Sequence, residues 1–293
     1  MILRRSTRRD GKSGLSQAQK EGHSVKLTDA ESHSYWRDGF VCKNKLFTSD
    51  EVAAMRAALA TDAKISGPQR ILEDGSDQMR ALYASHHRQS LFANLVRTPR
   101  LLAPVQKLLN SDAYVYQFKT NVKSALSGGG FSWHQDFHAW QLEDGLPEAR
   151  LVNIALFLDD VTEFNGPVVF AAGSHADQSD SRPKAGAQAQ HRHLDPRSIT
   201  LDRDELVELV GKYPLISPKG AAGSVVFFHP KVVHGSASNM SPHPRRLTII
   251  TYNDIRNLPK PNGAARPNYL VGDDTDALAI DHRPLLHATE GRQ

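Results

Sequence analysis

His134 and Asp136 stand two positions apart in the segment from Phe131 to Trp140, where aromatic and polar residues are interleaved. Side chains at positions i and i+2 of an extended segment point the same way, so this imidazole and this carboxylate could reach one metal ion together. A second imidazole, His234, follows an apolar run that ends at Phe228. Two imidazoles and one carboxylate on a single face are the ligand set of non-haem Fe(II) oxygenases. The sequence therefore predicts an iron site made by His134, Asp136 and His234.

An arginine that follows the distal histidine predicts a place for an anionic cosubstrate. Arg245 comes eleven residues after His234, at the head of another expected strand. Its planar guanidinium can grip a carboxylate through two parallel hydrogen bonds, and 2-oxoglutarate presents a carboxylate at its far end. The neighbouring Arg246 would point to the opposite face of the strand, and spacing alone does not decide between the two arginines.

Of the fourteen histidines in the chain, several lie in polar or loop contexts without a paired carboxylate and are not predicted to be ligands. They are His138, His175, His191, His193, His229 and His243. His138 lies nearest to the predicted site.

The composition is that of a soluble globular protein. The chain has 293 residues, of which 39% are hydrophobic and 23% charged, enough for a substantial core. Its one cysteine, Cys42, excludes an intramolecular disulfide. We find no signal-like run and no apolar stretch of membrane-spanning length, so we expect a cytoplasmic protein without a membrane partner. The sequence does not distinguish a monomer from a homodimer.

The net charge of +4 is concentrated in one segment. Residues 1–27 hold seven Lys or Arg and two acidic residues, a net charge of +5, so the rest of the chain sums to about −1. A basic arm can bind nucleic acid, but low hydrophobicity with charge is more typical of a disordered terminus. We predict a disordered basic tail over 1–27 and no nucleic-acid partner.

The chain changes character near residue 110. Residues 28–110 are predicted to be mostly helical, with helices over 28–38, from Thr48 onward with a capping-box pattern, and over 101–109. Short apolar or alternating segments then predict an antiparallel sandwich or barrel. The expected strands are 114–123, 131–136, 151–158, 167–171, 224–229 and 245–253, and residues 174–200 are expected to form a mobile surface loop. One domain over 28–293 is predicted, with helical support (28–110), a β core (111–255) and a C-terminal extension (256–293).

One face of the first expected strand is polar, which suggests that it lines a wet pocket. That face carries Gln117, Lys119, Asn121 and Lys123, and the opposite face carries Tyr116, Phe118 and Val122.

From about residue 35 to 255 the chain resembles the phytanoyl-CoA dioxygenase superfamily of Fe(II)- and 2-oxoglutarate-dependent oxygenases, and most of all its ectoine hydroxylase branch. The matching motifs are Gln117-x-x-x-Asn121-x-Lys123, Phe131-x-Trp-His-x-Asp-Phe137, Trp140-x-x-Glu-Asp-Gly-x-Pro147, Asn153-Ile-Ala-x-Phe-Leu-Asp159, Asn165-Gly-Pro167, Gly173-Ser-His175, His234-Gly-Ser236 and Pro244-Arg245.

The resemblance implies an all-β core, a double-stranded β-helix or jelly roll, with helices packed outside it. It implies that His134, Asp136 and His234 bind the iron. It also implies that 2-oxoglutarate chelates the iron, is held at its distal carboxylate by Arg245 and Ser236, and lies in a pocket lined by Lys123 and Asn121, with Lys119 as a further candidate. With O2 as the second cosubstrate, such enzymes hydroxylate an unactivated carbon and release succinate and CO2.

By the same matching, Gln117, Trp140 and Phe228 correspond to residues that hold the substrate in ectoine hydroxylases. Three positions depart from that branch: Ala139 replaces a threonine, Leu247 an asparagine and Ile249 a phenylalanine. Loss of polar partners leaves buried groups of a polar ligand unpaired at about 1–3 kcal/mol each. We therefore expect a small zwitterion, such as a free amino acid or a specialised-metabolite precursor, with ectoine 5-hydroxylation as the alternative.

Other functions receive less support from these residues. Halogenating relatives lack the carboxylate ligand, whereas Asp136 is present, although desaturation or ring formation stays open. A nucleic-acid demethylase would need a basic groove with aromatic residues, and the positive charge is confined to the tail. A non-catalytic jelly-roll binding module would be indicated by a broken triad or a missing arginine, and neither is broken.

Overall fold

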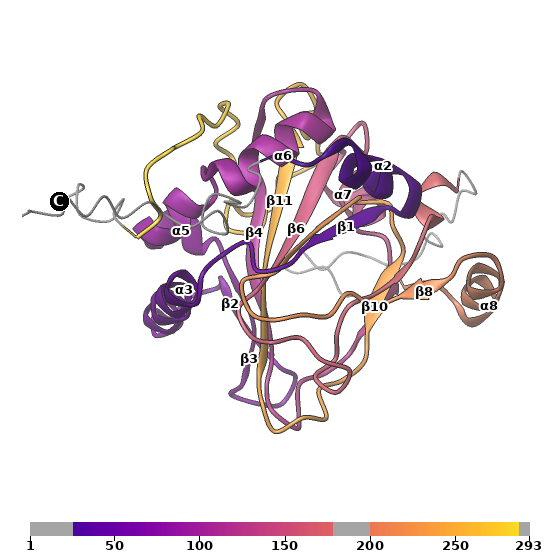
Figure 1. Cartoon of the computed structure of the whole chain (residues 1–293), viewed down its shortest axis with the longest axis horizontal. Helices are drawn as coiled ribbons and strands as arrows, with labels where there is room; N and C mark the ends of the chain where they lie inside the picture. Colours follow the sequence, from indigo (N-terminus) through magenta and orange to yellow (C-terminus); the bar gives the residue numbers. More distant parts are fainter. Residues whose placement is uncertain (1–25, 178–199, 287–293) are drawn as a thin grey trace, which may run out of the picture.

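The computed structural model describes residues 26–177 and 200–286, which form a jelly roll of two antiparallel sheets with helices outside it (Figure 1). The predicted basic tail, apart from its last two residues, lies outside the described residues, and so does most of the expected loop over 174–200. The described start of that loop forms a short 3₁₀ turn, η1 (Ser174–Ala176).

The larger sheet has seven strands, in the order β1-β9-β6-β11-β4-β3-β2. Their bounds are β1 Phe40–Lys43, β2 Arg70–Leu72, β3 Met79–Tyr83, β4 Ala113–Lys123, β6 Leu151–Phe157, β9 Val225–Phe228 and β11 Arg245–Asp254. The smaller sheet has the order β5-β10-β7-β8, with β5 Phe131–His134, β7 Val169–Ala171, β8 Leu215–Ile216 and β10 His234–Ser236. The jelly roll and all six predicted strands are confirmed, although β5 ends two residues earlier than expected.

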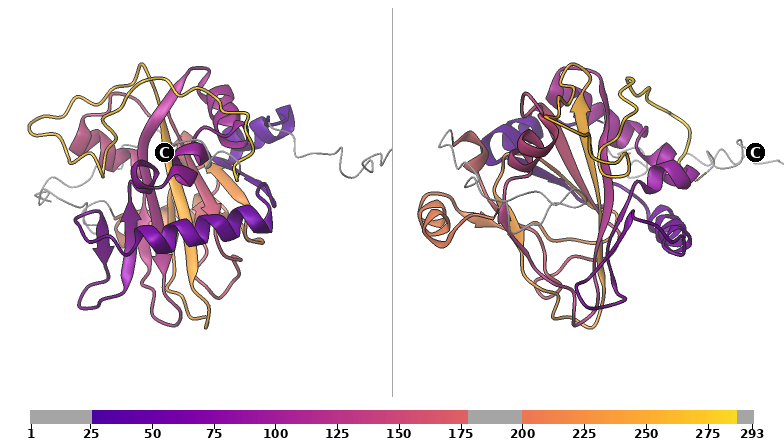
Figure 2. Two further views of the ribbon diagram at one scale, coloured as in Figure 1. Left: turned by 90° about the vertical axis from the view of Figure 1, so that its left-hand side faces the viewer. Right: turned by 180° about the vertical axis from the view of Figure 1, so that it is seen from behind.

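The helices α3, α5 and α6, which precede the β core in the sequence, pack on the outer face of the large sheet, and Figure 2 shows α3 crossing its strands. The helices of the described residues are α2 Asp29–Asp38, α3 Ser49–Asp62, α4 Ser85–Arg88, α5 Ser90–Leu95, α6 Pro99–Leu109, α7 Asp136–Asp144 and α8 Arg203–Lys212. Thr48 and Glu51 form the predicted capping box at the start of α3. Residues 28–110 are less purely helical than expected, because they also supply β1, β2 and β3 to the large sheet. None of the helices described is long and apolar enough to cross a bilayer.

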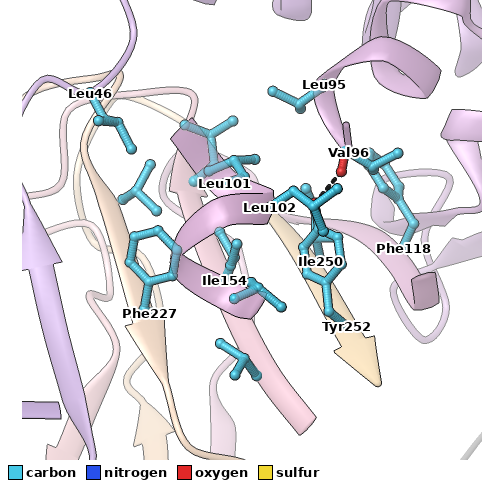
Figure 3. Close-up of a cluster of buried hydrophobic side chains, with 14 of the residues drawn as sticks. Leu46, Leu95, Val96, Leu101, Leu102, Phe118, Ile154, Phe227, Ile250 and Tyr252 are labelled. Atoms are coloured by element: carbon cyan, nitrogen blue, oxygen red, sulfur yellow. Dashed lines mark hydrogen bonds between the residues drawn. The ribbon is translucent and has the colours of Figure 1, made fainter. Parts of the chain in front are cut away.

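The main core lies between the outer face of the large sheet and the helices α3, α5 and α6 (Figure 3). Phe118 of β4 and Ile250 of β11 pack there with Leu102 of α6, and the hydroxyl of Tyr252 donates to the Val96 carbonyl at 2.8 Å. Burial of such apolar side chains contributes about 1.5–3 kcal/mol each. This packing holds the strands as a platform whose inner face carries polar residues.

The inner face of the large sheet is formed by β4 and β11 in register. Arg245 pairs with Lys123, Leu247 with Asn121, and Ile249 with Lys119. Since residues paired across strands point to the same side, the predicted polar face of β4 lies together with the start of β11.

A β-bulge in β4 corrects the predicted position of Tyr116. Thr251 of β11 pairs with Gln117, but the next residue, Tyr252, pairs with Val115, so Tyr116 has no partner in the register. An extra residue in one strand reverses the alternation beyond it. Tyr116 therefore lies on the same side as Gln117, with its ring 5.3 Å from that of Trp140.

Candidate metal centre

The structure brings His134, Asp136 and His234 together. His134 is the last residue of β5 and His234 the first of β10, and the two are partners in the antiparallel register. Their ring centroids are 4.4 Å apart. One ligand atom from each of the three residues lies within 4.8 Å of the others, and no other such group of His, Cys, Asp or Glu occurs in the described part of the chain.

Asp136 reaches this site from a helix and not, as predicted, from an extended strand. The backbone leaves the strand at Gln135, and Asp136 is the first residue of α7. The Phe137 amide donates to the Pro230 carbonyl at 3.0 Å, which ties the start of α7 to the segment before His234. A carboxylate is favoured at a helix N-terminus by the exposed amides and the helix dipole. The spacing of the two residues was informative, but the strand geometry assumed for it was wrong.

Both imidazoles are oriented with one nitrogen toward the carboxylate. The Nδ1 of His134 lies 2.7 Å from the Ser132 carbonyl, and the Nδ1 of His234 lies 3.0 Å from the Val232 carbonyl. A carbonyl can only accept, so each Nδ1 carries a proton, and in the neutral form of the ring the Nε2 has the lone pair. The Nε2 atoms lie 3.5 and 3.8 Å from the oxygens of Asp136. Neutral imidazoles oriented in this way have the form that binds a metal ion.

The electrostatics of the three residues favour a cation between them. Burial, with His134 nearby, lowers the pKa of His234 to about 4, so its ring is neutral at pH 7. Burial raises the pKa of Asp136, but His234, His134 and Lys119 outweigh it and hold that pKa below the usual range. Two imidazole nitrogens and one carboxylate, all buried or half-buried, converge on one point, and this donor set fits an iron ion with positions left open.

Arg245 lines a hollow of about 550 Å³ on one side of the triad, together with Asn121, Ser236 and Phe228. Its side chain is among the largest fully buried ones. One Nη donates to the Gly166 carbonyl at 2.7 Å, while the Nε is buried without a hydrogen-bond partner. Burial lowers the pKa of Arg245 to about 9. No carboxylate lies within ion-pair distance of it among the described residues, so this hollow suits an anion.

Arg246 points away from this hollow. Its Nε and Nη2 donate to the two oxygens of Asp159, at 2.7 and 2.6 Å. The choice that spacing left open is therefore made by the strand's alternation, which places Arg245 inward.

Lys123 stands behind the wall of the hollow. It is fully buried, its Nζ donates to the Ala237 carbonyl, and burial, with Arg245 and Arg80 nearby, lowers its pKa to about 7. Of the polar residues expected around the cosubstrate, Asn121 and Ser236 are in the wall, together with Lys119.

A second hollow, of about 690 Å³, adjoins the first at the triad and is lined by Gln117, Trp140 and Ala139. The two hollows share Lys119, Asn121, Phe131, His134 and Asp136. Phe228, expected beside Gln117 and Trp140, lines the first hollow and packs against the ring of His234, 5.4 Å between centroids. Leu247 and Ile249 also lie in the first hollow.

The amide of Gln117 leaves a buried acceptor in the second hollow. Its Nε2 donates to the Leu270 carbonyl at 2.9 Å, which fixes the orientation of the amide, and its Oε1 is buried without a partner. A buried unpaired oxygen costs about 1–3 kcal/mol unless a ligand donates to it.

The C-terminal extension completes the second hollow. The sequence analysis did not predict this contribution. Arg266 and Leu270 are in its wall. The Nε of Arg266 donates to Asp144 Oδ1 at 2.7 Å, and Asp144 also accepts from the hydroxyl of Tyr116. Gly145, at φ +61°, lets the extension pass close to the end of α7, where a Cβ would meet the Lys260 carbonyl. The yellow segment in Figure 2 runs over this end of the large sheet.

Other histidines have structural contacts. The rings of His175 and His229 lie 5.1 Å apart, near Tyr35 and Trp36. His191 and His193 lie outside the described residues.

Comparison with known proteins agrees with this geometry. The family model "Phytanoyl-CoA dioxygenase (PhyH)" matches residues 35–247. The L-proline trans-4-hydroxylase of Streptomyces griseoviridis is 36% identical over 264 residues, 88% of this chain and 97% of that protein. The ectoine dioxygenase of Bordetella bronchiseptica is 34% identical over 253 residues, 84% of this chain and 82% of that protein.

Solved structures show the same fold. EctD from S. alaskensis, in a crystal structure with 2-oxoglutarate and 5-hydroxyectoine, superposes with a TM-score of 0.77 at 28% identity, covering 88% of this chain and 89% of that one. The carbocyclase SnoK shares the fold at 21% identity, with a TM-score of 0.63 and coverage of 88% and 95%. From the match to the family model and the identity to these relatives, we conclude that the chain belongs to the phytanoyl-CoA dioxygenase family.

Proposed function

We propose that the chain is an Fe(II)- and 2-oxoglutarate-dependent hydroxylase of a small free amino acid, with L-proline as the first candidate substrate. The dioxygenase class follows from the family and from the triad. The observation that supports an amino-acid substrate is the second hollow, where an unpaired acceptor on Gln117 and the basic side chains of Lys119 and Arg266 stand together beside the triad.

In this proposal His134, Asp136 and His234 would hold the iron. The bound iron supplies the oxidising chemistry, converting 2-oxoglutarate and O2 to succinate and CO2 while the substrate gains a hydroxyl. The protein orients the reactants and excludes water. The Nδ1 contacts of the two histidines keep their rings in the required orientation throughout.

Arg245 is the proposed partner of the distal carboxylate of 2-oxoglutarate. Its buried, unpaired Nε can donate to that carboxylate, and Ser236 and Asn121 add polar contacts from the same wall. Lys123 does not line this hollow and is assigned no direct contact with 2-oxoglutarate. Leu247 and Ile249 give the rest of this hollow an apolar lining.

The second hollow offers complementary groups to an amino acid. Gln117 Oε1 can accept from the ammonium or imino nitrogen, because its Nε2 is already committed to Leu270. Burial lowers the pKa of Lys119, and no hydrogen bond ties its amine to another residue described here. Lys119 and the remaining Nη of Arg266 can therefore hold the carboxylate. Trp140 supplies an apolar wall for the carbon that is attacked.

Ectoine is the competing substrate, since ectoine dioxygenases are among the relatives. Ala139 lies in the second hollow, and Leu247 and Ile249 in the adjoining one. Ala139, in the hollow assigned to the substrate, replaces a polar residue of the ectoine hydroxylase branch, so it favours a substrate with fewer polar groups between its charged ends. A non-catalytic binding module is not supported, because the triad and Arg245 are complete.

Turnover of an amino-acid panel would test the proposal. Purified full-length protein with Fe(II), 2-oxoglutarate and O2 should form succinate and a product heavier by one oxygen from L-proline or another small amino acid, and Gln117→Leu should raise KM for that amino acid. The matched control is Gln106→Leu, because Gln106 lies on the outer helix α6 away from both hollows. Turnover of ectoine without turnover of any amino acid would overturn the proposed substrate.

A further inference from the structure

Asn153 connects the carboxylate of Asp136 to the large sheet. Its Nδ2 donates to Asp136 Oδ2 at 2.8 Å, and its Oδ1 accepts from the hydroxyl of Thr251 at 2.7 Å. Asn153 and Thr251 are fully buried. An ionised carboxylate only accepts hydrogen bonds, so the amide must present its nitrogen to Asp136 and its oxygen to the hydroxyl. The three side chains form one chain of hydrogen bonds with a fixed direction.

Asp136 comes from a different element than the two histidines. The histidines belong to the small sheet, whereas Asp136 is the first residue of α7. The Phe137 amide holds the backbone at the start of α7 through the Pro230 carbonyl, but it does not fix the orientation of the Asp136 carboxylate. The amide of Asn153 is the contact between this carboxylate and the inner face of the large sheet.

The same row of the large sheet also carries Gln117, which lines the hollow assigned to the substrate. In the register, Asn153 pairs with Phe228 on β9 and with Thr251 on β11, and Thr251 pairs with Gln117 on β4. Paired residues share a face, so Phe228, Asn153, Thr251 and Gln117 form one row across four neighbouring strands. Asp136 is therefore tied to the row that carries the unpaired acceptor of Gln117.

We propose that Asn153 and Thr251 are positioning residues that set the metal carboxylate relative to the substrate-binding row. The amide occupies Oδ2 of Asp136 and leaves Oδ1 without it, so Oδ1 is the oxygen that would be available to the metal. This inference rests on the proposed function and adds residues to it. Thr251 acts through Asn153, and neither residue touches the metal.

Substitutions at Thr251 separate this role from simple packing. Thr251→Val keeps the shape but removes the hydroxyl, so the amide oxygen of Asn153 loses its donor and the amide can turn. Thr251→Ser keeps the hydroxyl and should restore wild-type behaviour. Thr248→Val is the matched control, because Thr248 is a fully buried threonine of the same strand whose hydroxyl bonds Thr120 at 3.0 Å on the opposite face.

The readout is the affinity of the metal-free full-length protein for Mn(II). Binding is monitored by the loss of the electron paramagnetic resonance signal of free Mn(II), and 2-oxoglutarate is left out. Loss of a direct hydrogen-bond partner of a metal ligand usually weakens binding by roughly 10- to 100-fold. Thr251→Val should weaken Mn(II) binding by up to this amount, because it lets the amide of Asn153 turn away from Asp136. Thr251→Ser and Thr248→Val should bind as the wild type does. Urea unfolding of each metal-free variant shows that it is folded.

A second readout is coupling, the ratio of hydroxylated product to succinate. It should fall in Thr251→Val, because the metal is displaced relative to the substrate, and stay at the wild-type value in Thr248→Val. Wild-type Mn(II) affinity and wild-type coupling in Thr251→Val would overturn this inference and leave the proposed function standing. Failure of the wild-type protein to bind Mn(II) would instead overturn the proposed metal site itself.

Discussion

Replacing Arg245 by methionine is expected to separate binding of 2-oxoglutarate from the stability of the protein. The guanidinium is 1% exposed, and burial without a paired carboxylate lowers its pKa to about 9. A buried charge without a partner is costly, and the cost is offset only when an anion binds. Methionine has a similar length and no charge. The metal-free variant should therefore be as stable as the wild type, or more stable by up to about 4 kcal/mol.

The loss in cosubstrate affinity can be estimated from the contacts. A guanidinium gripping a carboxylate makes two charge-assisted hydrogen bonds, each contributing about 1.5 kcal/mol or more. Loss of both removes about 3 kcal/mol, which corresponds to a roughly 100-fold rise in Kd. The hollow keeps Ser236 and Asn121, so binding should be weakened and not abolished.

The assay is isothermal titration of 2-oxoglutarate into the protein loaded with Mn(II), together with urea unfolding of the metal-free protein. Arg246→Met is the matched control: it removes the ion pair with Asp159, so it should lower stability and leave the affinity for 2-oxoglutarate unchanged. Unchanged affinity in Arg245→Met, or a loss of equal size in Arg246→Met, would refute the assignment of Arg245.

Three further substitutions test other parts of the structure. Asp144→Asn weakens the hold on Arg266 and should raise KM for the amino acid more than it lowers kcat. The control is Asp62→Asn, which breaks a similar buried pair with Arg88 outside both hollows and should lower only stability. The same KM in Asp144→Asn and in the wild type would exclude a role for the extension. Burial lowers the pKa of His86 in the folded protein to about 3, whereas a histidine in the unfolded chain has a pKa of about 6.5. As the pH falls below about 6.5 the unfolded chain binds a proton that the folded protein does not, so the stability of the folded protein decreases. His86→Phe should therefore gain most stability at the acid end, measured by urea unfolding at pH 8 and pH 5, and a pH dependence equal to the wild type's would contradict this. Thr48→Ala, which removes the cap of α3, should cost about 1 kcal/mol in the same unfolding assay, and no loss would show that the cap is redundant.

The residues of the triad could be found from the sequence because their types are rare in combination and two of them stand only two positions apart. The spacing of His134 and Asp136 was read as a strand, yet the chain turns into α7 at Asp136. Local spacing cannot distinguish these geometries, because a ligand pair two residues apart converges on a metal in either of them. The start of α7 is held by the hydrogen bond from the Phe137 amide to the Pro230 carbonyl. A contact between segments so far apart in the sequence cannot be inferred from local spacing.

Alternation along β4 and β11 predicted which residues face the hollow up to Gln117, and failed beyond it. The bulge at Tyr116 adds a residue that pattern reading does not register, since aromatic residues suit both faces of a buried sheet. Alternation also could not choose between Arg245 and Arg246 without knowing which face is inside. The ion pair of Arg246 with Asp159, 87 residues apart, settles it.

The contribution of the C-terminal extension could not be predicted. Residues 255–286 contain no helix or strand, and they carry no periodic pattern that indicates where they lie. Arg266 reaches the second hollow because Asp144, 122 residues earlier, binds it. A contact of this range depends on the complete fold, and a single arginine in a Pro- and Gly-rich segment gives no signal of it.

The most direct test of the iron centre is the visible spectrum of the anaerobic protein with Fe(II) and 2-oxoglutarate. We predict a weak charge-transfer band in the wild-type protein that is absent from folded His134→Ala and Asp136→Ala variants. A wild-type protein that binds Fe(II) and 2-oxoglutarate without developing this band, or an undiminished band in both variants, would contradict the assignment of His134, Asp136 and His234 as the iron site.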